Sequence, residues 1–161
     1  MILANLNNID WNTLGSDQIP ELIRTIYESD TKEERYSEAF GSLQELLYPQ
    51  GIEDHWDWGG PRRMMQNDLP HQVTPFLIEI LENTESANKM YNIVGLLGEL
   101  CKYEYYHKWL GNEGQAEYIE WAWKLRDQVR LGLPLYQQYL TGSDEYLRDR
   151  AQELMKWLEY K

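Results

Sequence analysis

The stretch IPELIRTIYESDTKEERYSEAF, residues 19–40, decides the fold that this sequence predicts. A proline opens a short apolar helix, a polar turn follows, and a second amphipathic helix begins. The same order recurs in TPFLIEILENTESANKMYNIVGLL (74–97) and in LPLYQQYLTGSDEYLRDRAQELM (133–155). Three copies of a helix pair are typical of a helical repeat protein, in which neighbouring pairs stack and bury a continuous core.

The rest of the chain fits a single all-α domain covering residues 1–161. Residues 115–129 carry apolar side chains at the helical period and predict one extra helix between the second and third pairs. No segment alternates polar and apolar residues over the length of a strand, so we expect no strands. A loop at about residues 49–69 interrupts the pattern, and the second pair resumes at Pro70.

The composition limits the class of partner. The 161 residues include 42% hydrophobic side chains with seven Trp and twelve Tyr, enough to form the core of one domain. Lys and Arg number 15 against 27 Asp and Glu, so the formal net charge is -12. Such a charge repels a phosphate backbone and attracts basic proteins, so we expect a protein partner and no nucleic acid.

No part of the sequence predicts export or a membrane segment. The N-terminus, MILANLNNIDW, lacks the basic start of a signal peptide, and no stretch approaches the roughly 18 apolar residues of a membrane helix. The single cysteine, Cys101, lies in the apolar run IVGLLGELC, where a buried structural thiol is expected. We therefore expect a soluble, cytoplasmic protein with no membrane partner.

Charged residues recur at the turns of the helix pairs. They are Asp30 with Arg35, Asp144 with Arg148 and, in the middle pair, Glu85 with Lys89. The Asp and Arg positions resemble those of HEAT-like or armadillo-like repeats. The resemblance implies a right-handed α-α superhelix, a HEAT-like solenoid, whose second helices line the concave side. We expect the carboxylate to cap the second helix and the guanidinium to bridge to a neighbouring pair.

Longer stretches of the chain resemble a family of small bacterial HEAT-like proteins. The stretches are NNIDW (7–11), IPELIR (19–24), LLYPQG (46–51) and VTPFLIEIL (73–81). Some similar proteins are encoded beside polymorphic toxins, where they look like immunity proteins. The resemblance therefore implies a role in binding another protein, and none of its motifs is catalytic.

The loop sequence EDHWDWGGPRRMM, residues 53–65, is a candidate binding segment. Trp56 and Trp58 have the side chain that most often anchors an interface, and Asp54 and Asp57 add negative charge beside them. An alternative stays open, in which both tryptophans fold back on the repeat surface and hold the loop in place.

A second candidate surface is the acidic face that begins the second helix of the first pair. Glu34 and Glu38 are spaced four residues apart, so both point to the same side of that helix. This face meets a basic partner if it lies on the concave side of the solenoid. Equally, it is a solvated face whose charge only keeps the protein soluble.

The sequence contains no pattern that requires a metal, a cofactor or a catalytic residue. Asp54, His55, Asp57 and His71 supply metal-binding atom types, but no paired histidines or calcium-binding loop fix them on one face. Cys101 and His107 lack a third orienting group, so a nucleophilic pair is not predicted. We expect no metal, no cofactor and no enzymatic activity.

These observations favour a protein-binding module. The specific prediction is an immunity protein that neutralises a toxin by steric occlusion, using an acidic, aromatic surface against a basic one. Trp56, Trp58, Asp54, Asp57, Glu34 and Glu38 are its predicted contact residues. The alternatives are a scaffold or chaperone built from HEAT repeats and a HEAT-like DNA glycosylase, which would need a basic groove.

Overall fold

The computed structural model describes residues 3–47, 68–102 and 115–159, and for 115–118 the backbone only. Within these ranges every regular element is helical and no strand occurs, which confirms the all-α prediction. The elements are η1 (Leu6–Asn8), α1 (Ile19–Glu28), α2 (Glu34–Leu47), α4 (Leu69–Glu82), α5 (Ala87–Cys101), α7 (Gln115–Arg130), α8 (Leu133–Thr141) and α9 (Glu145–Glu159).

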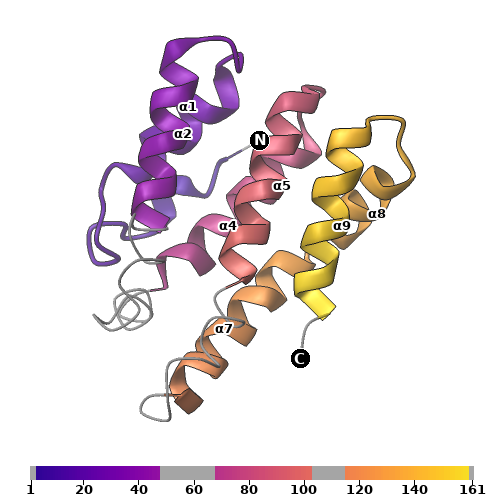
Figure 1. Cartoon of the computed structure of the whole chain (residues 1–161). Coiled ribbons are helices and arrows are strands. Elements are labelled where there is room, and N and C mark those ends of the chain that lie inside the picture. The colour runs from indigo at the N-terminus through magenta and orange to yellow at the C-terminus, as the bar shows by residue number, and fades with distance from the viewer. Residues whose placement is uncertain (1–2, 48–67, 103–114, 160–161) are drawn as a thin grey trace.

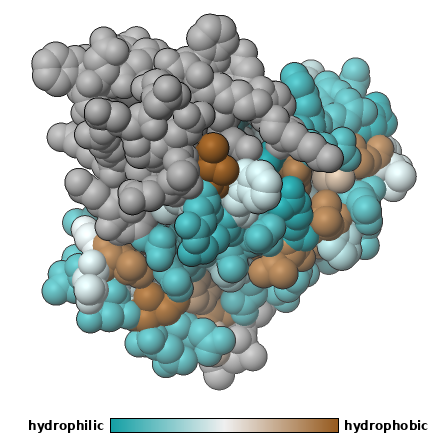
Figure 2. All heavy atoms as spheres, turned by 90° about the horizontal axis from the view of Figure 1, so that it is seen from below, coloured by the Kyte–Doolittle hydropathy of each residue, from teal (hydrophilic) through white to brown (hydrophobic). Residues whose placement is uncertain are grey.

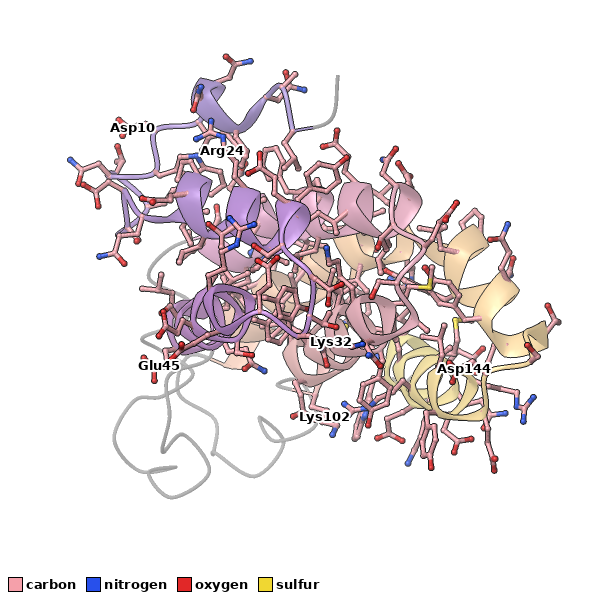
Figure 3. All side chains as sticks on the ribbon, turned by 90° about the horizontal axis from the view of Figure 1, so that it is seen from above. Asp10, Arg24, Lys32, Glu45, Lys102 and Asp144 are labelled. Carbon is pink, nitrogen blue, oxygen red and sulfur yellow. The ribbon has the colours of Figure 1, made fainter. Side chains whose placement is uncertain are left out.

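The helices pack as three pairs, α1 with α2, α4 with α5 and α8 with α9 (Figure 1). The second helices α2, α5 and α9 lie along one side of the molecule, and α1, α4 and α8 lie behind them (Figures 1 and 3). The extra helix α7 packs against α4 and α5. The three predicted pairs and the predicted extra helix are therefore all present.

Helix α5 lies at the centre of the core. It packs along α9 over much of its length and also contacts α4 and α7. Six consecutive residues, from Ile93 to Gly98, are buried, which requires neighbours on nearly every side of a helix. Cys101 is buried at its end, so the thiol is structural as predicted.

Two of the helix starts show how the turn residues act. Asp144 caps α9, where its Oδ1 accepts a hydrogen bond from the backbone amide of Leu147 at 3.0 Å. The corresponding prediction for Asp30 is wrong, because its Oδ1 accepts instead from the Lys32 amide at 2.9 Å, inside the turn. Helix α2 begins at Glu34, later than a cap at Asp30 would place its start.

Cations of the second helices connect each pair to the one before it. The buried Lys89 of α5 donates from Nζ to the carbonyl of Tyr27 at 3.0 Å, in the last turn of α1. That carbonyl has no partner within its own helix, so a cation is favourable there. In the same way Arg150 of α9 donates to the Tyr91 hydroxyl of α5 at 2.7 Å.

The bridging role predicted for Arg35 and Arg148 is therefore wrong. The guanidinium of Arg35 pairs with Glu33 in its own turn. The guanidinium of Arg148 donates to the Gly142 carbonyl at 3.1 Å, also within its own pair. Only Lys89, the cation at the matching position of the middle pair, bonds to the pair before it among the three.

The segment before α1 covers α4. Leu3, Leu6 and Trp11 are buried, and the Trp11 ring lies 5.9 Å from the ring of Phe76 on α4. The Trp11 indole donates to the carbonyl of Leu6 at 2.6 Å, which keeps its N–H paired inside the core. The amide of Leu3 donates to the Glu79 carboxylate at 2.8 Å. This segment thereby joins the first pair to the second.

Helix α7 holds the end of α9. Arg126 donates to the carbonyl of Trp157, and Arg130 donates to the carbonyl of Leu158 at 2.7 Å. Both carbonyls belong to the last turn of α9, where the helix leaves its own carbonyls unpaired.

Among the described helices, none has the length and apolar character that crossing a membrane requires.

Candidate functional site

The predicted acidic face on α2 is present and exposed. Glu34 and Glu38 are both exposed to solvent, one turn apart, and no ion pair holds either carboxylate within the described ranges. The same unit is strongly negative, because residues 3–47 contain nine Asp and Glu against three Lys and Arg. Unpaired carboxylates in such a unit attract a cationic surface.

The other four predicted contact residues lie outside the described part of the chain. Trp56, Trp58, Asp54 and Asp57 belong to residues 48–67. Their grouping into one binding segment stays a prediction from the sequence.

His71, weighed above as a distant metal ligand, instead joins α4 to α7. Its Nε2 lies 2.8 Å from the carbonyl oxygen of Trp121, so this nitrogen carries the proton and donates it. The Trp121 ring packs edge-on against the imidazole at 4.8 Å between centroids. Burial lowers the pKa of His71, which keeps the ring neutral. In the three described ranges no cluster of His, Cys, Asp and Glu suits a metal ion.

A groove of about 310 Å³ lies between α5 and α9. Its lining on α5 includes Val94 and the backbone of Gly95 and Gly98. Gly95 leaves room for the side chain of Arg150, since a Cβ on Gly95 would stand only 2.4 Å from a guanidinium nitrogen of Arg150. Lys102, which follows α5 and lines the groove, lies on the same side of the molecule as Glu45 of α2 (Figure 3).

Both cations in the groove wall are held by neighbours. The Nζ of Lys102 lies 2.7 Å from the carboxylate of Glu99 and 3.9 Å from that of Glu153. The guanidinium of Arg150 lies over the Tyr91 ring at 4.1 Å, in addition to its hydrogen bond with the Tyr91 hydroxyl. Neither cation is therefore free to move without losing a contact.

Two groups on the rim remain available to a ligand. Tyr146 is the most exposed large hydrophobic side chain described, at 75% of its maximal surface. Asp149, one turn further along α9, is exposed and has no ion pair in the described ranges. Sequence reasoning missed this site, although Tyr146, Asp149 and Glu153 share one face of α9 by their spacing.

The described part of the lower face is mixed in character. Seen from below, it combines hydrophilic residues with separate apolar patches (Figure 2).

In comparisons with protein-family models, with curated proteins and with solved structures, nothing matches this chain.

Proposed function

We propose that this chain is a protein-binding module of the HEAT-like kind, which neutralises a basic partner by covering it, in the manner of an immunity protein. The proposal includes a right-handed superhelix, in which α2, α5 and α9 line the concave binding side. Steric occlusion is its mechanism, and no residue of the chain performs catalysis in it.

The observation that carries the proposal is the acidic face of α2. Glu34 and Glu38 are exposed and unpaired in the described ranges, in a unit where carboxylates outnumber cations nine to three. Helix α2, which carries both residues, lies on the same side of the molecule as α5 and α9, the helices that form the groove (Figures 1 and 3). Separate negative surfaces on one side favour a single extended basic partner over two small ligands.

The test begins with affinity capture on the immobilised chain, followed by identification of the retained protein. Association rates are then measured for the wild type and for the double variant Glu34→Lys, Glu38→Lys. Because steering acts through long-range charge, we expect about a tenfold slower association at low salt and a much smaller effect at high salt. For an immunity protein, coexpression should also restore the growth of cells that produce the captured protein.

A matched control carries the same change in net charge on another helix. Asp17→Lys with Glu21→Lys reverses two exposed carboxylates beside and on α1, behind the proposed binding side. This control should slow association far less than the α2 variant. Equal rates for the two variants, or tight salt-sensitive binding of duplex DNA in place of a protein, would remove the proposal.

A further inference from the structure

The groove between α5 and α9 has the dimensions of a site for one side chain. Its volume of about 310 Å³ lies at the lower end of the range for ligand pockets. Of the lining residues on α5, Gly98 presents only backbone, Gly95 lies under the Arg150 guanidinium, and Val94 is fully buried. A long aliphatic stem can pack beside Gly98, provided that its polar end reaches the rim.

The rim carries an excess of negative charge. Glu99, Asp149 and Glu153 line the groove together with two cations, Lys102 and Arg150. Lys102 is paired with Glu99, and Arg150 is stacked on an uncharged tyrosine. Glu153 accepts a hydrogen bond from the Trp157 indole at 2.9 Å, so Asp149 is the carboxylate left for a ligand.

An aromatic ring stands beside that carboxylate. Tyr146 and Asp149 are three residues apart on α9, so they lie on the same face of the helix. The Tyr146 ring is largely exposed and offers its face to a cation, and Asp149 offers a charge-assisted hydrogen bond. Within the same groove, Arg150 of α9 already stacks its guanidinium on the ring of Tyr91 on α5.

We infer that the groove between α5 and α9 accepts a lysine or arginine side chain of the partner protein. The stem lies beside Gly98, and the cation sits between Tyr146 and Asp149. This inference rests on the proposed function, because it specifies how one basic residue of the partner is held. The acidic face of α2 steers the partner, and the groove anchors it.

The experiment uses the whole chain labelled with ¹⁵N and two short acetylated peptides. One peptide has a single lysine among glycines, and the other has norleucine in its place, which keeps the stem and removes the charge. The lysine peptide should shift the amide resonances of Gly95 and Gly98, and the norleucine peptide should bind about tenfold more weakly. Equal binding of the two peptides would overturn the inference.

Variants on the rim locate the contact. Tyr146→Ala and Asp149→Asn each change an exposed side chain, and each should weaken lysine-peptide binding about tenfold without changing the melting temperature. Glu145→Gln is the matched control, since it removes a neighbouring exposed charge of α9 that does not line the groove. Equal weakening by the control would show general attraction and no site.

Removal of Arg150 tests whether the ligand carries a positive or a negative charge. Arg150→Gln deletes a cation from the wall, so it should strengthen binding of the lysine peptide and would weaken binding of an anion.

The outcomes separate the inference from the proposed function. Amide resonance shifts confined to α2 on addition of the lysine peptide would overturn the inference while leaving the proposed function intact. The inference would also be overturned if the captured partner dissociated at the same rate from the wild type and from both rim variants. Failure of the wild type to retain any partner removes the proposed function instead.

Discussion

At the scale of single residues, Gly95 leaves the space that the guanidinium of Arg150 occupies. An added Cβ would meet the Arg150 guanidinium at 2.4 Å, and the flexible end of that side chain would have to move away from Tyr91. Gly41 on α2 is the opposite case, because an added Cβ there meets nothing within 4 Å. Both glycines stand in helices, so each alanine gains intrinsic helix propensity.

We therefore expect the two substitutions to differ. Gly41→Ala should raise the free energy of unfolding by about 1 kcal/mol. Gly95→Ala gains the same propensity but loses the hydrogen bond and stacking of Arg150, together about 1 kcal/mol, so its net change should be close to zero. Denaturant unfolding measures the change in the free energy of unfolding for each of the two variants. In an Arg150→Ala background Gly95→Ala should become stabilising, and an unchanged effect there would contradict the proposed contact.

Single residues also show where the sequence is informative. The exposure of Glu34 and Glu38 followed from helical spacing, because local periodicity decides which side of a helix meets water. The cations that join the pairs, Lys89 and Arg150, were not predicted. Their partners lie 62 and 59 residues away, at distances set by the packing of whole helices.

At the scale of helices, the contact between α4 and α7 is sensitive to pH through His71. Burial lowers the pKa of this histidine below its ordinary value of 6.5. Asp68, 3.9 Å from Nδ1, favours the charged ring, and Lys124 on α7 opposes it. Since the unfolded chain then binds more protons, the stability that His71 contributes is present above about pH 6.5 and is lost as pH falls from there through the lower pKa of the folded state.

The variant His71→Gln isolates this effect. Its amide can still donate to the Trp121 carbonyl but does not titrate, and the other two histidines remain in both chains. Between about pH 7.5 and about pH 5.5, the free energy of unfolding should fall more steeply for the wild type than for the variant. Parallel pH profiles would show that His71 is not the responsible group.

Helix positions were predictable wherever the apolar period was strong. The extra helix, predicted at residues 115–129, spans Gln115–Arg130, and the second pair begins one residue before the predicted Pro70. The start of α2 was not predicted correctly, because Asp30 bonds within the turn and not to the helix. The groove was not predicted either, since it depends on how α5 and α9 approach each other across about fifty residues of chain.

At the scale of the whole molecule, negative charge opposes folding. A net charge of -12 produces repulsion that screening relieves, and residues 3–47 contribute half of that charge. Raising the salt concentration from about 0.01 M to about 0.1 M shortens the Debye length from about 30 Å to about 10 Å. The melting temperature should therefore rise by roughly 2–4 °C, equivalent to about 1 kcal/mol.

The rise should be smaller for Glu34→Gln with Glu38→Gln, because that variant removes two of the repelling charges. Differential scanning calorimetry at the two salt concentrations compares the chains. A melting temperature that falls with salt would mean that surface ion pairs, such as Lys124 with Glu120 at 3.2 Å, outweigh the repulsion.

The arginines of α7 bear on how the protein is made. Arg126 and Arg130 donate to the carbonyls of Trp157 and Leu158, which lie 31 and 28 residues later in the chain. The ribosome therefore makes both guanidiniums before it makes either acceptor. The first two pairs can assemble on the growing chain, whereas α7 obtains the partners of its two guanidiniums only after α9 has been made.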